Sequence, residues 1–263
     1  MNSRHSITRI LFSLLGSLLV IFIILPILTT FFVTPLTEVS ATFSDPQAMN
    51  AIGVTLGASL LATVLGAALG IPLAYILANH KFFGKRPLEA IIDLPIVIPH
   101  TAAGIALLMV FGSRGVLGAW LAKLGWFFTD TLSGTVVAML FISVPYLVNF
   151  AREGFESVDK ELESNALVDG ANTWQMFWKI SLPLAGRSVM AGLVMMWARG
   201  ISEFGAVIIL AYHPLTIPTL ILQRFQGFGL KAAQPLAFLF IILILVIFVI
   251  VRTLFQPSDY RKK

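Results

Sequence analysis

The chain has 263 residues, of which 57% are apolar and only 12% are charged, and its net charge is +5. An average soluble domain carries about 25% charged residues, so this composition excludes an ordinary soluble protein. The absence of cysteine also excludes disulfide bridges and thiolate metal sites. The basic residues lie beside long apolar runs, which indicates orientation in a lipid bilayer and not nucleic-acid binding.

Six apolar runs are long enough to cross the ~30 Å hydrocarbon core of a bilayer as helices. They cover residues 10–33, 51–77, 94–111, 132–150, 184–210 and 235–254. The first run follows Arg4 and Arg9, as in a signal peptide, but it exceeds the usual apolar length of about 7–15 residues and no clear cleavage site follows it. We therefore interpret it as a retained helix, and predict an all-α membrane protein with one transmembrane domain over residues 1–263.

The Lys and Arg residues predict how the chain is oriented. With a cytoplasmic N-terminus, thirteen of them fall inside and four outside, while Arg199 lies within a span. The four outer residues are Arg114, Lys123, Arg224 and Lys231. Because cytoplasmic loops carry an excess of Lys and Arg, we expect both termini and the segment 156–183 on the cytoplasmic side of the cell membrane.

Two prolines mark the beginning of the third run, which reads DLPIVIPHTAAG. Pro95 and Pro99 remove two backbone donors within one turn, which predicts a kinked or irregular helix. Irregular backbone at membrane depth is tolerated against protein or a water-filled cavity, so this run forms either a pathway wall or a simple kink at the membrane face. His100 has no second ligand at helical spacing, which favours a structural role over metal binding.

The fifth run contains an ionisable pair, Arg199 and Glu203, with Ser202 between them in WARGISEFGAV. Charges inside a membrane are costly and often mark a transport route. The alternative is an i,i+4 ion pair that only neutralises itself, in the less favourable order with the cation first. The sequence leaves both interpretations open: a pathway or gate, and a structural pair.

The segment 156–183 is the one long, charged and helix-capable stretch between two apolar runs. Asp169-Gly170 is a turn signal that predicts two short helices, near Lys160–Val168 and Thr173–Ser181. We expect the second to begin at a cap on Asn172 or Thr173 and to stop before Pro183.

This segment also carries groups suited to a protein partner. Trp174, Phe177 and Trp178 are large apolar side chains that would fill a cleft in a partner or tuck under the helix bundle. The acidic residues of the segment are Glu156, Asp159, Glu161 and Glu163. Anionic lipid would repel these carboxylates, so the pattern favours a protein partner over a helix lying on the membrane.

Residues Glu163–Pro183 resemble the EAA motif of ABC-transporter permeases, which runs Glu-Ala-Ala, then Gly, then Leu-Pro. The matching residues are Ala166, Gly170, Ala171, Ile180, Leu182 and Pro183. Ser164 and Asn165 occupy the Glu-Ala positions, and Glu163 lies one place early. Further runs, LPIVIPHTAAGIALLMVFG, ARGISEFGAVIILA and PLTIPTLIL, look like the molybdate, tungstate and sulfate branch, especially its molybdate and tungstate permeases.

The resemblance implies a type I ABC importer permease with the MetI-like fold and a cytoplasmic coupling helix. It implies two cytoplasmic ABC ATPase subunits, two permease subunits and an external oxyanion-binding protein. The two permease subunits are expected to be two copies of this chain in a homodimer, with a pair of sister permeases as the alternative. The residues it assigns to ATPase coupling are Glu163, Ser164, Ala166, Asp169, Gly170, Ala171, Trp174, Leu182 and Pro183. Pathway or gate candidates are Arg199, Ser202, Glu203, Pro95, Pro99 and His100.

The chain itself has no G-x-x-x-x-G-K-[ST] phosphate loop, so ATP and Mg are expected on the partner ATPase and no cofactor on this chain. The expected cargo is molybdate or tungstate, with sulfate or thiosulfate as the alternative. A secondary transporter or channel is a rival class, but repeated halves or several intramembrane charges are not seen. An intramembrane enzyme would need convergent catalytic groups, which the sequence does not offer.

Overall fold

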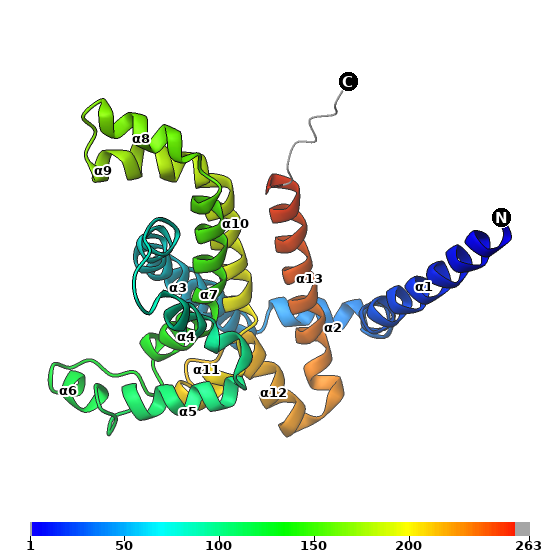
Figure 1. Ribbon diagram of the computed structural model, residues 1–263. Helices are drawn as coiled ribbons and strands as arrows, with labels where there is room; N and C mark the ends of the chain where they lie inside the picture. The colour runs from blue at the N-terminus through cyan, green and yellow to red at the C-terminus, as the bar shows by residue number, and fades with distance from the viewer. Residues whose placement is uncertain (1, 256–263) are drawn as a thin grey trace. The chain divides into compact units, whose positions relative to one another are not determined.

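The computed structural model describes residues 2–255, with the side chains of residues 8–249 and 253, and the described chain is helical (Figure 1). The helices are α1 (Asn2–Val33), α2 (Leu36–Phe43), α3 (Pro46–Asn79), α4 (Lys85–Val97), α5 (His100–Phe111), α6 (Gly118–Lys123), α7 (Leu132–Glu156), α8 (Lys160–Val168), α9 (Thr173–Met176), the π-helix η1 (Phe177–Ser181), α10 (Leu182–Ile201), α11 (Gly205–Leu210), α12 (Ile217–Phe228) and α13 (Leu230–Phe255). The predicted all-α membrane class is confirmed.

Among residues 2–255, five helices are long and apolar enough to span a membrane, and the bent pair α4–α5 makes a sixth if it counts as one span. The chain divides into two compact units, one formed by residues 1–49 with 221–245 and the other by residues 50–220 with 246–263. Each unit is described by itself.

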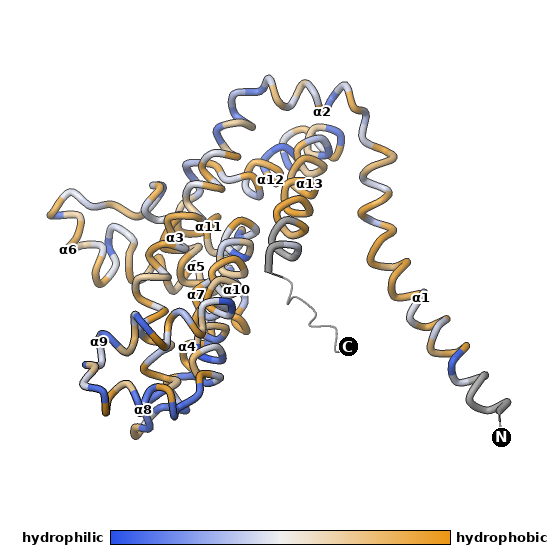
Figure 2. Tube along the Cα trace, turned by 90° about the horizontal axis from the view of Figure 1, so that it is seen from above, coloured by the Kyte–Doolittle hydropathy of each residue, from blue (hydrophilic) through white to orange (hydrophobic). Residues whose placement is uncertain are grey.

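In the first unit, α1 exposes its apolar side chains along its length, and Figure 2 shows it orange over most of that length. The Phe31 and Phe238 rings meet edge to face at 4.9 Å. The amide of Gln234 donates to Thr34 Oγ1 at 3.0 Å. Arg224 and Asp45 form an ion pair within the same unit.

In the second unit, α7 packs along α10. Glycines at this contact allow the two backbones to approach closely. A Cβ on Gly192 would lie 2.9 Å from Phe150 Cβ, and one on Gly154 would lie 2.6 Å from Ser188 Cβ. Gly66 brings α3 against α10, since a Cβ there would lie 2.2 Å from Met196 Cε. Small residues at helix interfaces serve this purpose in membrane proteins.

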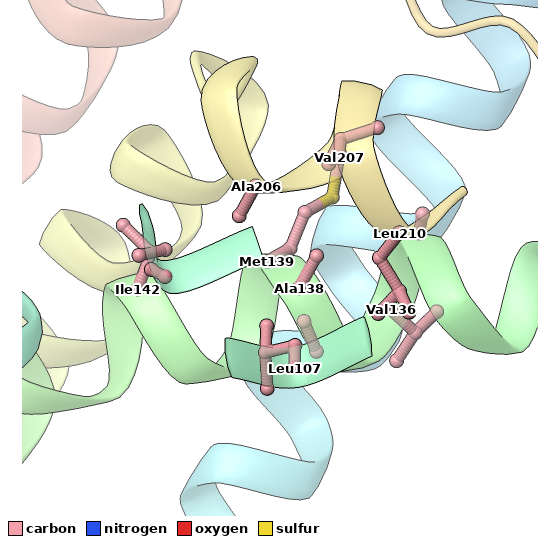
Figure 3. Packing of buried hydrophobic residues seen from close by; sticks show 11 residues of the cluster. Leu107, Val136, Ala138, Met139, Ile142, Ala206, Val207 and Leu210 are labelled. Carbon is pink, nitrogen blue, oxygen red and sulfur yellow. The ribbon is translucent and has the colours of Figure 1, made fainter. Parts of the chain in front are cut away.

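A buried apolar cluster joins α3, α5, α7 and α11 in this unit (Figure 3). Its labelled members are Leu107, Val136, Ala138, Met139, Ile142, Ala206, Val207 and Leu210. Two polar contacts hold α4 to α7: Arg152 Nη1 donates to Glu89 Oε1 at 2.7 Å, and Asn149 Nδ2 donates to Asp93 Oδ1 at 2.6 Å.

The third predicted span, 94–111, is broken in the structure, because α4 and α5 meet at 114°. Ile98 has an extended backbone with ψ of 146°, as expected for a residue that precedes proline. The break falls at Pro99, whereas Pro95 remains inside α4. The irregularity was therefore predicted correctly, but only one of the two prolines causes it.

The fifth predicted span, 184–210, is also interrupted. Helix α10 ends at Ile201, and α11 begins at Gly205 after three non-helical residues. The carboxylate of Glu203 accepts the backbone N–H of Ala206 at 2.8 Å, which satisfies one of the free donors at the beginning of α11. The helix α12 was not predicted.

Candidate functional site

The two helix breaks meet at a cluster of three ionisable side chains. Arg199 comes from the last turn of α10, Glu203 from the break after it, and His100 from the first residue of α5. Arg199 Nη2 lies 2.7 Å from Glu203 Oε2, and His100 Nδ1 lies 3.2 Å from the same oxygen. The structure thus places His100 in contact with the ion pair of Arg199 and Glu203. This contact was not predicted from the sequence.

Glu203 is fully buried, and its carboxylate is nevertheless fully partnered. One oxygen faces the cation and the imidazole, and the other accepts the N–H of Ala206. A buried charge is tolerated when it is paired and hydrogen-bonded in this way. Glu203 is therefore well suited to hold the break between α10 and α11 in place.

His100 contacts both of the other groups. Arg199 Nη2 is 2.9 Å from His100 Nδ1 and 3.0 Å from Nε2. Arginine only donates hydrogen bonds, so the ring nitrogen that receives it must be unprotonated. A neutral imidazole with its proton on Nδ1 satisfies both neighbours, because Nδ1–H then donates to Glu203 and Nε2 accepts from Arg199.

The side chain of Arg199 is partly exposed beside the break between α10 and α11. It is 17% exposed, whereas the side chain of Glu203 is fully buried. The second terminal nitrogen, Nη1, lies 3.4 Å from Ser202 Oγ. A small anion that approaches the break would therefore meet Arg199 and Ser202 before Glu203.

Two glycines allow the helices to pack closely at the two breaks. A Cβ on Gly205 would lie 2.7 Å from His100 Cβ, and a Cβ on Gly104 would lie 2.8 Å from Ile209 Cβ. These glycines allow α5 and α11 to pack in close contact. Gly205, two residues after Glu203, was the available sequence signal for this contact, and no contact was predicted from it.

Pro99 belongs to the cluster as the residue that caps α5 just before His100. Pro95 does not belong to it. It lines a separate, almost wholly apolar cavity of about 290 Å³ beside Gly70 and Val144. Of the six predicted pathway residues, the structure therefore brings five together and places Pro95 elsewhere.

The turn between α8 and α9 has the geometry that the sequence predicted. Gly170 has φ of +87°, the left-handed conformation that glycine adopts without strain. Ala171 N–H donates to Ala166 O at 2.9 Å and Gly170 N–H to Leu167 O at 3.1 Å. These two bonds form a Schellman motif around Asp169 at the end of α8.

The second short helix begins as predicted and ends differently. Asn172 caps it through a capping box with Gln175, with bonds of 3.0 and 2.8 Å. It does not stop before Pro183, because η1 leads directly into α10. Pro183 follows the π-helical turn directly and lies inside a helix that continues from Thr173 to Ile201.

The large side chains of this helix face in two directions. Trp174 is 70% exposed and Trp178 is 50% exposed. Phe177 points the other way, with its ring 5.0 Å from Tyr75 and 6.1 Å from Phe155. Phe177 therefore packs under the bundle, as one of the two possibilities has it, and the two indoles are exposed. That they fill a cleft in a partner stays a prediction.

Glu163 is buried, although it belongs to the predicted coupling residues. Ser181 Oγ donates to its Oε1 at 2.7 Å, and Lys160 Nζ lies 3.1 Å from its Oε2. Ser164 and Pro183 are exposed, and Leu182 is half-buried. The link from Glu163 to Ser181 was not predicted. Among residues 2–255, no group of three His, Asp or Glu side chains is placed to hold a metal ion.

Comparisons with known proteins agree with this architecture. Residues 70–261 match the family described as "Binding-protein-dependent transport system inner membrane component". The chain belongs to this family, and it is a multi-pass membrane protein. The fold is that of ABC importer permeases. A structure of a bacterial ABC transporter involved in alginate import has a TM-score of 0.74 at 21% identity, covering 98% of this chain and 100% of that chain.

Curated relatives are more similar in sequence. The chain is 40% identical over 253 residues to the molybdate/tungstate transport system permease protein WtpB of Thermococcus kodakarensis, covering 95% of this chain and 97% of the relative. It is also 40% identical to WtpB of Pyrococcus abyssi, covering 94% and 95%. The sulfate transport system permease protein CysT of Escherichia coli is 33% identical, covering 90% and 88%.

Proposed function

We propose that this chain is the membrane-spanning subunit of an ATP-driven importer that moves a tetrahedral oxyanion, molybdate or tungstate, into the cytoplasm. Support for the cargo comes from the relatives at 40% identity, which are named as molybdate/tungstate permeases. In this proposal residues 1–263 form one permease domain.

The observation that carries the proposal is the meeting of two helix breaks at Arg199. Non-helical backbone and charged groups at membrane depth are costly and occur where a protein lines a cavity or path. A guanidinium in a medium of low dielectric constant attracts a dianion strongly. Glu203, 2.7 Å away, partly offsets that attraction, so the ion is drawn in without being trapped.

The segment 160–183 supplies the connection to ATP in this proposal. Its turn at Gly170 and its exposed Trp174 and Trp178 would dock into a cleft of a cytoplasmic ATPase, which binds ATP and Mg. The complete transporter would contain two such ATPases, two copies of this chain, and an external oxyanion-binding protein. The N- and C-termini would face the cytoplasm, in agreement with the Lys and Arg distribution.

Sulfate is the second candidate cargo, because a sulfate permease is also similar over most of the chain. The test is ATP-driven uptake into vesicles that contain the permease, its ATPase and its external binding protein. We expect uptake of labelled molybdate and tungstate, with little inhibition by an excess of sulfate. If only sulfate is taken up, sulfate is the cargo and molybdate and tungstate are not. If none of the three ions is taken up in an ATP-dependent way, the proposed function is refuted.

A further inference from the structure

Residues 112–131, with the short helix α6, connect α5 to α7 at the end of α7 opposite to α8 (Figure 1). In the orientation proposed above, this connection faces the outside of the cell. Figures 1 and 2 place α6 to the side of α7 and not in line with its axis. Because α7 is long enough to span the membrane, a segment beside its outer end lies near the level of the outer lipid headgroups.

Large apolar side chains are exposed along most of this connection. Trp120 of α6 is 60% exposed, and Trp126, which follows α6, is 65% exposed. The other exposed apolar residues are Val116, Leu117, Leu124 and Phe127. Single exposed apolar residues are common on protein surfaces, but a concentration of this kind marks an interaction surface.

The backbone of the connection is fixed by hydrogen bonds. Val116 N–H donates to Met109 O at 3.1 Å, which folds the chain back over the end of α5. Trp126 N–H donates to Leu121 O at 3.0 Å. The exposed side chains therefore project from a defined fold that is tied to α5, and not from a loose loop.

The charges of the connection match a lipid surface. From residue 112 to residue 129 it contains Arg114 and Lys123 and no Asp or Glu. Cations of this kind suit the phosphate groups of lipids. Tryptophan is enriched at membrane interfaces, where its ring lies among apolar chains and its N–H reaches water or headgroups. Segments that lie in the interface combine Trp, Phe and Leu with Lys and Arg, as this one does.

A lipid surface also suits these side chains better than a protein that binds and leaves. The external binding protein of the proposed importer must leave the permease to collect its next ion. Its departure would return the two indoles to water in every cycle, at a cost in free energy. Lipid is present throughout the cycle.

We propose that residues 116–127 form an interfacial anchor in the outer leaflet of the membrane. In this anchor Trp120, Trp126 and Phe127 lie among the lipid headgroups and the adjoining part of the acyl chains. The partner of this surface is therefore the bilayer itself. The lipid contact does not depend on the identity of the cargo.

The anchor acts on the candidate site through α5. The chain folds back onto Met109 near the end of α5, so the anchor fixes this end of the helix. The first residue of the same helix is His100, which contacts Arg199 and Glu203. The anchor thereby helps to hold one of the two helix breaks in place. This effect on transport rests on the proposed function.

The chain has no cysteine, so one nitroxide label can be attached at a single introduced cysteine. The test places full-length permease with Leu124→Cys in lipid nanodiscs, before the ATPase is added. It compares collisions of the label with oxygen, which concentrates in lipid, and with a water-soluble nickel complex. We expect mainly oxygen collisions, at a depth of about 5–10 Å in the boundary between headgroups and acyl chains. Glu161→Cys, at an exposed position of α8, is the water reference and should collide mainly with the nickel complex.

Two other results overturn the anchor. A label at Leu124→Cys that meets the nickel complex, and is shielded from it only when the external binding protein is added, identifies a docking surface for that protein. A label that is shielded from both reagents without that protein identifies a contact with a second copy of the chain.

Replacement of both indoles tests what the anchor does. Trp120→Ser with Trp126→Ser should move the Leu124→Cys label into water and slow molybdate uptake several-fold, because α5 loses its outer attachment. Trp120→Phe with Trp126→Phe is the matched control, since it keeps the apolar surface and should leave both measurements near normal. Normal uptake with the label in water would overturn the role of the anchor at α5. Absent uptake by the unmodified protein would refute the proposed function and leave the label measurement unaffected.

Discussion

Ser181 Oγ donates a 2.7 Å hydrogen bond to the buried carboxylate of Glu163. The bond joins α8 to η1, the π-helical turn that leads into the membrane-spanning helix α10. Lys160 approaches the other carboxylate oxygen and also contacts Asn79 at the end of α3. A displacement of α8 by a partner is thus connected directly to two membrane helices.

We expect Ser181→Ala to loosen this connection, because it leaves a buried carboxylate oxygen unpaired at a cost of about 1–3 kcal/mol. Backbone amides of residues 160–181 should exchange faster with deuterium, and fewer ions should be transported per ATP hydrolysed. Ser40→Ala is the control, since this exposed hydroxyl lies outside the segment and bonds to the Thr37 carbonyl of its own helix, α2. Unchanged exchange and unchanged coupling in Ser181→Ala would show that the bond has no such role.

Gly170→Ala should weaken docking of the ATPase. The residue has φ of +87°, and a side chain in this conformation costs about 1 kcal/mol or more. The turn between α8 and α9 would shift to relieve that strain. Copurification of the ATPase measures the effect. Gly186→Ala in α10 should be harmless, because its φ is not positive and nothing lies within 4 Å of an added Cβ. Equal ATPase recovery from the two variants would contradict the prediction.

Trp174→Ala tests the exposed indole face directly. Large aromatic side chains at the centre of an interface contribute about 2 kcal/mol or more, so docking of the ATPase should weaken by at least about tenfold. Trp120→Ala, on α6 at the opposite end of α7, removes an indole that is also mostly exposed and should leave docking unchanged. A titration of labelled ATPase onto the permease in nanodiscs gives both affinities. Equal affinities would exclude Trp174 from the interface.

Gly205→Ala should destabilise the contact between the two helix breaks. The added methyl would lie 2.7 Å from His100 Cβ, and crowding of this kind costs about 1–3 kcal/mol. We expect a lower midpoint of thermal unfolding for the solubilised protein. Gly57→Ala in α3 is the comparison, because an added Cβ there meets nothing within 4 Å. A midpoint as high as that of the unmodified protein would mean that α5 and α11 can separate without cost.

Local sequence patterns were sufficient to predict most of the structure of the segment between α7 and α10. The bounds of α8, the turn at Gly170 and the cap at Asn172 were all predicted, because caps and turns depend on residues within a few positions. The predicted stop before Pro183 was wrong, because the helix continues through the π-helical turn η1 into α10.

The candidate site itself depends on distant contacts that no local pattern contains. His100 and Arg199 are 99 residues apart, and only packing of α5 on α11 brings them together. Hydropathy also did not reveal the break after Ile201, since the residues of α11 are as apolar as those of α10. Within the break, the buried carboxylate of Glu203 accepts the backbone N–H of Ala206 in α11.

The central claim is that Arg199 attracts the ion along its path and is not only a structural partner of Glu203. A structural pair predicts that Arg199→Gln loses folded protein, because it leaves Glu203 buried and without its cation. In that case Arg199→Gln combined with Glu203→Gln should recover folding, since no uncompensated charge remains.

The most direct measurement is ATP-driven molybdate uptake by Arg199→Gln, normalised to the amount of folded protein in the membrane. We predict uptake at least about tenfold slower, because the ion loses its one charge-assisted contact at the break, while the amount of folded protein falls much less. Uptake at the normal rate in well-folded Arg199→Gln protein would contradict the account.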